Sequence, residues 1–421
     1  MSIVVVGMLD EREEALRIIK EQIEKRGHRV ILIDVSIGTG AIVPTLKPEV
    51  RSDELARLAG GDIEEIKKML SKEREKATAT LAEGLTRKVL NLYQAGQLQG
   101  MISIAGMTGT FLSITAMKAL PFGLPKLLIS SVAAMPAYAN RLADYFGVRD
   151  ITVMHSVVDT VGLNPLVRTL ALNGANAISG MVEGFEPSKE EAKPAIAITE
   201  FGFVDKGAHY IRDLLEKDYS LVSFHATGLG DRAAKDLVSQ GFFQAFIDLV
   251  PASFSEYLFG GNRASGPDRL DGPRDSGIPY ILAPCGFDMI SCGPIDRKDK
   301  GDSLWVSRNL AARKLLVQDS LRVQARTSVE EMEVIARSVA EKLNQYKEKR
   351  FVKFVIPQKG FSSLSVEGGA LFDPVADQAF VNELKKNLDP QIKIREVAAH
   401  INTPEFARAV VEALRESLKE S

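Results

Sequence analysis

Short strand-like and helix-like segments alternate along nearly the whole chain, and this alternation restricts the fold more than any other feature. The first strand-like run is "SIVVVG" (2–7). A stretch with helical spacing of Leu16, Ile19 and Ile23 follows, and then "HRVILIDV" (28–35). A strand, a helix and a second strand in succession form a βαβ unit, whose strands are parallel and whose crossover is right-handed. The sequence therefore predicts an α/β fold.

The alternation is interrupted once and then starts again. Residues 183–194, "EGFEPSKEEAKP", are polar and contain two prolines, and "AIAITEF" (195–201) begins a new series of strands. We predict an N-terminal α/β domain over 1–184, a linker at about 185–194 and a C-terminal α/β domain over 195–421. Each is expected to be a doubly wound, Rossmann-like parallel sheet, with a ligand cleft between the two domains.

Composition excludes several classes of protein. The net charge is −2, which gives no reason to expect binding to nucleic acid or to a membrane surface. No run of 18 apolar residues predicts a membrane-spanning helix. The start, "MSIVVVGMLDEREE", has no basic flank and is interpreted as a strand and not as a signal peptide. With only two cysteines, a disulfide framework is not expected, and a cytoplasmic location is the default.

The metal-ligating residue types are scattered. The five histidines include no H-x-x-x-H pair, and Cys285 and Cys292 have no second pair of cysteines. We predict no structural zinc and no dedicated metal site. An Mg²⁺ ion that accompanies a bound phosphate remains compatible with the sequence, because Mg²⁺ is often held by few carboxylates plus phosphate.

Two glycine-rich turns between a strand and a helix have the composition of anion sites. One is "AGMTGT" (105–110), expected to open a helix at Phe111. The other is "HATGLGD" (225–231). At such turns backbone N–H groups and the helix dipole favour anions, and glycine allows a phosphate to approach.

The second turn has three interpretations. Gly228, Gly230 and Ala233 form G-x-G-x-x-A, and Asp248 stands 20 positions beyond Gly228, which matches the spacing of a dinucleotide fingerprint. A phosphate site of another kind fits the same glycines. So does a tight turn that holds no ligand.

Further candidates end other predicted strands or start helices. Ser265 in "SGPDRL" either caps a helix or contacts a ligand. Asp288 follows the strand at 279–284, and Lys359 follows the strand at 351–357, where a solvated surface lysine is the alternative. His225 ends a strand and is a candidate general base, or else a structural hydrogen bonder.

Long stretches of the chain resemble the UPF0261, or Tm-1-like ATP-binding, family. The resemblance is carried by "LPFGLPKLLISSVA", "DITVMHSVVDTVGLN", "FHATGLGDRA", "SGPDRL", "PQKGFSSLSVEGGALFDPVAD" and "HINTPEFA". It implies two α/β subdomains, a homodimer and bound ATP. The residues that it places at the ligand are Gly106, Gly109 and Thr110 in the first loop, Thr227, Gly228 and Gly230 in the second, and Ser265, Gly266, Asp268, Lys359 and Gly369 elsewhere. Thr108, in the first loop, is a further candidate for phosphate binding.

The chain also departs from that family's pattern. The usual opening resembles G-T-L-D-T-K-G, whereas "GMLDERE" (7–13) lacks the threonine, the lysine and the last glycine. Met107 stands in the first glycine-rich loop, and "APC" replaces "SPG", which argues against Cys285 as a nucleophile.

These observations lead to one principal reading and two alternatives. The principal reading is a protein that binds ATP, a related nucleotide or another anionic metabolite through its glycine-rich loops. The second is a hydrolase or lyase that uses His225 as base, with Asp288 or Asp268 to orient it. The third is an interaction protein whose nucleotide is structural.

Overall fold

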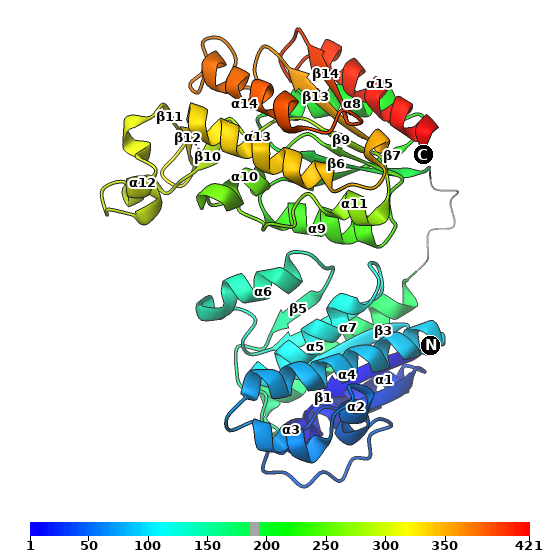
Figure 1. Ribbon diagram of the computed structural model, residues 1–421. Helices are drawn as coiled ribbons and strands as arrows, with labels where there is room; N and C mark the ends of the chain where they lie inside the picture. Colours follow the sequence, from blue (N-terminus) through cyan, green and yellow to red (C-terminus); the bar gives the residue numbers. More distant parts are fainter. Residues whose placement is uncertain (186–192) are drawn as a thin grey trace. The chain divides into compact units, whose positions relative to one another are not determined.

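The computed structural model describes residues 1–185 and 193–421, and the chain divides into two compact units (Figure 1). Unit 1 is Met1–Ser188 and unit 2 is Lys189–Ser421. Of the predicted linker, residues 186–192 lie outside the described part of the chain. No helix among the described residues is long and apolar enough to cross a membrane.

Unit 1 is built on one parallel sheet of five strands, whose spatial order is β2-β1-β3-β4-β5. The strands are β1 (Ser2–Gly7), β2 (Arg29–Asp34), β3 (Gly100–Ala105), β4 (Lys126–Ser130) and β5 (Thr152–His155). The first four strands are rich in Val, Ile and Leu and are buried on both faces, as expected of a parallel sheet covered by helices.

Helices cover both faces of this sheet (Figure 1). On one face lie α1 (Leu9–Lys25) and α7 (Pro165–Glu183). On the other face lie α2 (Ser52–Leu58), α3 (Ile63–Met69), α4 (Arg74–Gln94) and α5 (Met107–Ala119). The short η1 (Pro136–Tyr138) and α6 (Ala139–Phe146) precede β5. Ile19 and Ile23 of α1 are fully buried, so the predicted helical spacing does face the sheet.

Unit 2 is built on a parallel sheet of six strands in the order β14-β13-β9-β8-β6-β7. These are β6 (Ala195–Glu200), β7 (Ser220–His225), β8 (Ala245–Asp248), β9 (Tyr280–Leu282), β13 (Val352–Pro357) and β14 (Lys393–Val397). A small antiparallel sheet, which the sequence reading did not anticipate, consists of β10 (Met289–Ser291), β11 (Leu315–Val317) and β12 (Val323–Arg326).

The helices of unit 2 again form two layers. One face of the main sheet packs on α8 (Asp205–Leu215) and α15 (Pro404–Glu420). The core on the other face includes residues of α9 (Leu229–Ser239), α10 (Ala252–Phe259), α12 (Ser303–Ser307), α13 (Val329–Asn344) and α14 (Pro374–Asn387). The remaining short helices are α11 (Gly272–Ser276), η2 (Ile295–Arg297), η3 (Leu310–Ala312) and η4 (Lys349–Phe351).

Both units have the same topology, and the predicted fold class of two doubly wound α/β domains is confirmed. In each unit the second strand pairs on one side of the first strand, and the third strand pairs on the other side. The chain therefore changes direction at one point of each sheet, between β1 and β3 and between β6 and β8. In such folds, ligands bind at this switch point, beyond the carboxyl ends of the strands.

One local prediction is wrong. The helix after the first glycine-rich turn begins at Met107, not at Phe111, so most of residues 105–110 form the first turn of α5.

Candidate functional site

At the switch point of unit 1, the N-terminus of α5 is uncapped. β3 ends at Ala105, and Gly106 is the N-cap residue, which has no side chain to accept from the helix. The N–H groups of Met107, Thr108 and Gly109 have no acceptor within an α-helix, because helical bonding starts one turn later. With the helix dipole, they favour a bound anion at this end of α5.

A buried arginine lies against the same helix end. Arg12, in the first turn of α1, is only 4% exposed, and its backbone departs from helical geometry (φ −132°, ψ 26°). A Cβ placed on Gly106 would lie 2.5 Å from Nη2 of Arg12. Gly106 thus allows the guanidinium to approach the backbone at the start of α5. A fixed positive charge and a set of N–H donors meet at this point.

The guanidinium of Arg12 is positioned by neighbouring acidic and hydroxyl groups. Its Nε donates to Oγ1 of the buried Thr160 at 2.7 Å, and Nη2 lies 3.5 Å from the carboxylate of Asp159. Nη1 pairs with Glu11. The Asp159 side chain is 73% exposed, so this carboxylate can leave Arg12 without being removed from water.

The loop that carries Asp159 and Thr160 is strained. Val157 has a φ of 63°, and the N–H of Val158 donates to the carbonyl of Ser156 at 2.6 Å, which closes a very tight turn. A left-handed conformation is unfavourable for a β-branched residue. Such strain is concentrated at functional positions. The loop follows the carboxyl end of β5, just as α5 follows the carboxyl end of β3.

The other predicted residues of the first loop all lie in α5, and they differ in how deeply they are buried. Thr108 is partly exposed in the first turn of α5, whereas Gly109 is buried, and a Cβ there would lie 3.0 Å from Cβ of Ala105. The hydroxyl of the fully buried Thr110 hydrogen-bonds that of Ser130 at 2.7 Å.

The second glycine-rich loop differs from the first at its N-cap residue, whose N–H already has a partner within the chain. It follows β7, which is an edge strand and not part of the switch point. Gly228 has a φ of 90°, and its N–H donates to Oδ2 of Asp231 at 2.7 Å. Asp231 is almost fully buried in the first turn of α9. Its carboxylate therefore places a negative charge of the chain itself at the start of α9.

The glycines of this loop are explained by packing. A Cβ on Gly230 would lie 2.1 Å from the carbonyl oxygen of His225, so Gly230 lets α9 pack closely on the end of β7. A Cβ on Gly228 would lie 2.9 Å from the carbonyl oxygen of Arg263. The side chains of His225 and Thr227 are exposed. The tight-turn interpretation accounts for this geometry without a ligand.

An internal ion network occupies the switch point of unit 2. The guanidinium of Arg269 donates to both oxygens of Asp248 at 2.7 and 2.9 Å and to Asp231 at 2.7 Å. The hydroxyls of Thr199 and Tyr280 each donate to Asp248 at 2.6 Å. All of these groups are buried. Burial and the Asp248 charge raise the pKa of Tyr280 well above its usual value.

This network overturns the dinucleotide interpretation. Asp248 has both carboxylate oxygens engaged and is fully buried, so it cannot accept from a ribose hydroxyl. The strand that it ends, β8, is also separated from β7 by β6 in the sheet.

The other predicted residues of unit 2 lie on different loops. Ser265 hydrogen-bonds Ser253, and Asp268 pairs with Lys235, which together with other nearby groups lowers the pKa of Asp268 despite its partial burial. Gly266 has a φ of 146°. Lys359 is exposed. A Cβ on Gly369 would lie 2.3 Å from the carbonyl oxygen of Leu364, so this glycine is required by the packing of its own loop.

Asp288 is fully enclosed and has local partners. Its carboxylate accepts from the N–H of Gly286 at 3.0 Å and from the hydroxyl of Ser362 at 2.5 Å. Among the described residues, no hydrogen bond or ion pair joins His225 to Asp288 or Asp268. The assignment of His225 and Asp288 as an acid–base pair stays a prediction. Burial also raises the pKa of the Cys285 thiol well above its usual value, which leaves it protonated and unreactive.

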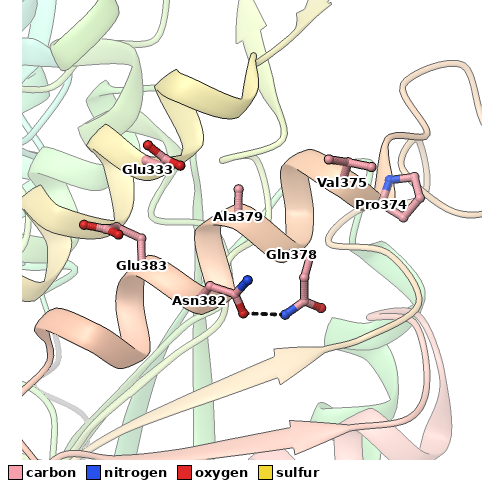
Figure 2. A pocket seen from close by; sticks show the side chains of 7 residues that line it. All are labelled: Glu333, Pro374, Val375, Gln378, Ala379, Asn382 and Glu383. Atoms are coloured by element: carbon pink, nitrogen blue, oxygen red, sulfur yellow. Dashed lines mark hydrogen bonds between the residues drawn. The ribbon is translucent and has the colours of Figure 1, made fainter.

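A surface groove of unit 2 lies away from all of these residues. Figure 2 shows that it runs between α13 and α14, and that its lining residues are Glu333, Pro374, Val375, Gln378, Ala379, Asn382 and Glu383. Gln378 donates to Asn382 at 2.8 Å across the helix surface. The groove has two carboxylates and no lysine or arginine in its lining, so it does not suit an anion.

Arg12, the cation of this candidate site in unit 1, was not among the residues predicted from the sequence. A signal was present, since "GMLDERE" follows the first strand, and Arg12 stands where the family pattern has its lysine. The charge is retained at this position although the residue type differs. What the sequence could not reveal is that the loop after β5 returns to contact Arg12.

The fold and the unit 1 site define a two-unit α/β protein of the doubly wound class, with an anion-compatible helix end at one switch point. Comparison with known proteins specifies the family. The N-terminal domain model of the Uncharacterised protein family (UPF0261) matches residues 1–187, and its C-terminal domain model matches residues 193–418. The chain belongs to the UPF0261 family.

Individual relatives support this membership. A UPF0261 protein of Clostridium tetani is 34% identical over 414 residues, which cover 98% of both chains. A UPF0261 protein of Rhizobium meliloti is 31% identical and is also covered to 98% in both chains. The ToMV resistance protein Tm-1(GCR237) of Solanum lycopersicum is 32% identical over 327 residues, which are 76% of this chain and 41% of that protein.

Proposed function

We propose that this protein binds ATP, a related nucleotide or another phosphorylated metabolite, and that its phosphate subsite is in unit 1. The subsite consists of the Arg12 guanidinium and the N–H groups of Met107, Thr108 and Gly109. The observation that carries the proposal is the approach of Nη2 of Arg12 to Gly106, at the uncapped start of α5. The nucleotide itself is an expectation from the family resemblance, and the homodimer and the cytoplasmic location are further proposals of the same origin.

The chemistry of the subsite suits a phosphate better than a carboxylate metabolite. A phosphoryl group has three terminal oxygens, which can accept from the planar guanidinium and from two or three backbone N–H groups together. Asp159 is the group that a phosphate would displace, because it is the exposed anion on Nη2 of Arg12. Thr160 holds Nε of Arg12, an atom that does not contact Asp159, so the guanidinium retains this contact when Asp159 leaves.

A thermal-shift panel of phosphate, pyrophosphate, AMP, ADP, ATP and a non-phosphorylated nucleoside tests this proposal. Mass spectrometry of small molecules retained by the purified protein complements it. We expect the melting temperature of the wild-type protein to rise with the phosphorylated compounds and not with the nucleoside. In Arg12→Gln this rise should be lost. A panel without any phosphate-dependent shift would remove the proposal.

A further inference from the structure

Two carboxylates lie together beside the proposed phosphate subsite. Asp10 is in the first turn of α1, directly after β1, and Asp34 is the last residue of the neighbouring strand β2. Ser36 connects them, since it accepts from the N–H of Asp10 at 3.2 Å and donates its hydroxyl to Oδ1 of Asp34 at 2.5 Å. The chain direction thus brings two acidic side chains to adjacent strand ends.

Each carboxylate uses one oxygen and leaves the other without a donor. Oδ1 of Asp34 accepts from the N–H groups of Leu9 and Ser36 at 3.2 and 2.9 Å, as well as from the Ser36 hydroxyl. No hydrogen bond from the described residues reaches its Oδ2. Oδ2 of Asp10 accepts from the N–H of Gly40 at 3.0 Å, whereas its Oδ1 is buried and has no partner. Asp10 as a whole is 7% exposed.

Gly40 fixes which oxygen of Asp10 is engaged. A Cβ on Gly40 would lie 1.9 Å from the carbonyl oxygen of Asp10, and the N–H of Ile42 donates to that carbonyl at 3.0 Å. The segment around Gly40 therefore packs directly against Asp10, and the N–H of Gly40 donates to Oδ2 of that residue. Oδ2 of Asp10 is therefore the oxygen that this segment engages, and Oδ1 is not engaged.

No positively charged side chain among the described residues compensates the negative charge of these two carboxylates. Neither Asp10 nor Asp34 forms an ion pair with a lysine or arginine there. The guanidinium of Arg12, two residues beyond Asp10 in the same helix, is engaged by Glu11, Asp159 and Thr160. Two adjacent, poorly solvated carboxylates are unfavourable unless a proton or a cation joins them.

We infer that Asp10 and Asp34 bind a hard divalent cation of the magnesium type through their unengaged oxygens. Mg²⁺ prefers oxygen ligands, needs only one or two protein carboxylates, and fills its remaining positions with water and phosphate oxygens. A group of three or more His, Cys, Asp or Glu side chains, as a zinc site needs, does not occur among the described residues. The cation site adjoins the proposed phosphate subsite, but it can be tested with metal alone.

Titration of the full-length protein with Mn²⁺, followed by electron paramagnetic resonance of the free ion, tests this inference. Mn²⁺ has the same ligand preference and is directly observable. We expect one saturable Mn²⁺ site per chain, from which excess Mg²⁺ displaces the ion. Asp10→Asn and Asp34→Asn should each weaken Mn²⁺ binding ten-fold or more. Glu21→Gln, an exposed acidic position on the same helix, is the matched control and should leave the affinity unchanged.

The outcomes separate this inference from the proposed function. Absence of a saturable Mn²⁺ site in the wild-type protein overturns the inference, whether or not the variants fold. So does unchanged Mn²⁺ affinity in a folded Asp10→Asn protein, which would indicate that the two carboxylates share a proton instead. Arg12→Gln should retain Mn²⁺ binding, so loss of phosphate binding in that variant concerns only the phosphate subsite.

Discussion

Units 1 and 2 share a topology but use their switch points differently. In unit 2 the ends of β6 and β8 enclose a network in which Arg269 is surrounded by Asp231, Asp248 and Tyr280, and every charge has a partner inside the chain. In unit 1, Arg12 lies against an uncapped helix, with an exposed carboxylate as one of its partners. Fold alone therefore does not locate a ligand. The difference lies in the burial of the partners, since those of Arg269 are enclosed, whereas Asp159 beside Arg12 is 73% exposed.

The glycines of the two units are also required for different physical reasons. Gly230 is required because the backbone of β7 lies directly beside it, whereas Gly106 is required because the guanidinium of Arg12 lies beside it. A glycine-rich turn in a sequence does not distinguish these causes. Only the neighbour of the missing Cβ does.

The largest effect should come from removing the arginine of unit 2. Arg269→Met leaves Asp231 and Asp248 buried without their cation, and breaking a buried ion pair from one side costs about 3–5 kcal/mol. Urea denaturation should show this loss in the unfolding free energy of unit 2. Arg274→Met, at a more exposed pair, is the control. A loss below about 1 kcal/mol, the scale of a surface ion pair, would contradict the structural role of the network.

The next effect contrasts the two glycines directly. Gly230→Ala forces a shift of backbone against backbone and should destabilise unit 2 by about 1–3 kcal/mol. Gly106→Ala displaces the end of the Arg12 side chain and no backbone, so it should destabilise unit 1 less than Gly230→Ala destabilises unit 2, and it should weaken phosphate binding. Chemical denaturation and a phosphate-ligand titration of both variants check this. The comparison fails if Gly106→Ala is the more destabilising change.

A smaller effect should follow from the exposed carboxylate on Arg12. Asp159→Asn removes the anion that competes with a phosphate, and an exposed ion pair of this kind contributes about 0.2–1 kcal/mol. We therefore expect phosphate binding to tighten by about two- to five-fold, as measured by calorimetry. Weaker binding in Asp159→Asn would show that this side chain helps to hold the ligand.

The smallest effect should come from a surface ion pair of unit 1. Glu183, at the end of α7, accepts from Arg26 at 2.6 Å and contacts His28 at 2.9 Å, and these partners lower its pKa to about 2. Because the pKa is lowered in the folded state, the stabilisation is present above the ordinary value of 4.5 and is lost as pH falls toward 2. Glu183→Gln should therefore lower the melting temperature slightly at pH 7 and not at pH 2. Equal losses at both pH values would point to packing instead of charge.

The fold class could be predicted from the sequence, whereas the residues of the candidate phosphate site could not. Alternation of Val- and Ile-rich runs with amphipathic helices is a local signal, and it predicted both parallel sheets. The roles of Arg12 and Arg269 depend on contacts over long sequence distances, with Thr160 for Arg12 and Asp231 and Asp248 for Arg269. No local pattern encodes such contacts. The small sheet of β10, β11 and β12 was missed because β11 and β12 follow one another without an intervening helix, outside the alternation on which the prediction was based.

We propose that the phosphate subsite is at Arg12 in unit 1 and not at the loops of unit 2. Isothermal titration calorimetry of ATP with the full-length wild-type protein, Arg12→Gln and Lys359→Gln tests it most directly. We predict that Arg12→Gln weakens binding by ten-fold or more, about 1.4 kcal/mol, while Lys359→Gln remains within about two-fold of the wild type. Loss of binding in Lys359→Gln with unchanged binding in Arg12→Gln would contradict the account and move the site to unit 2.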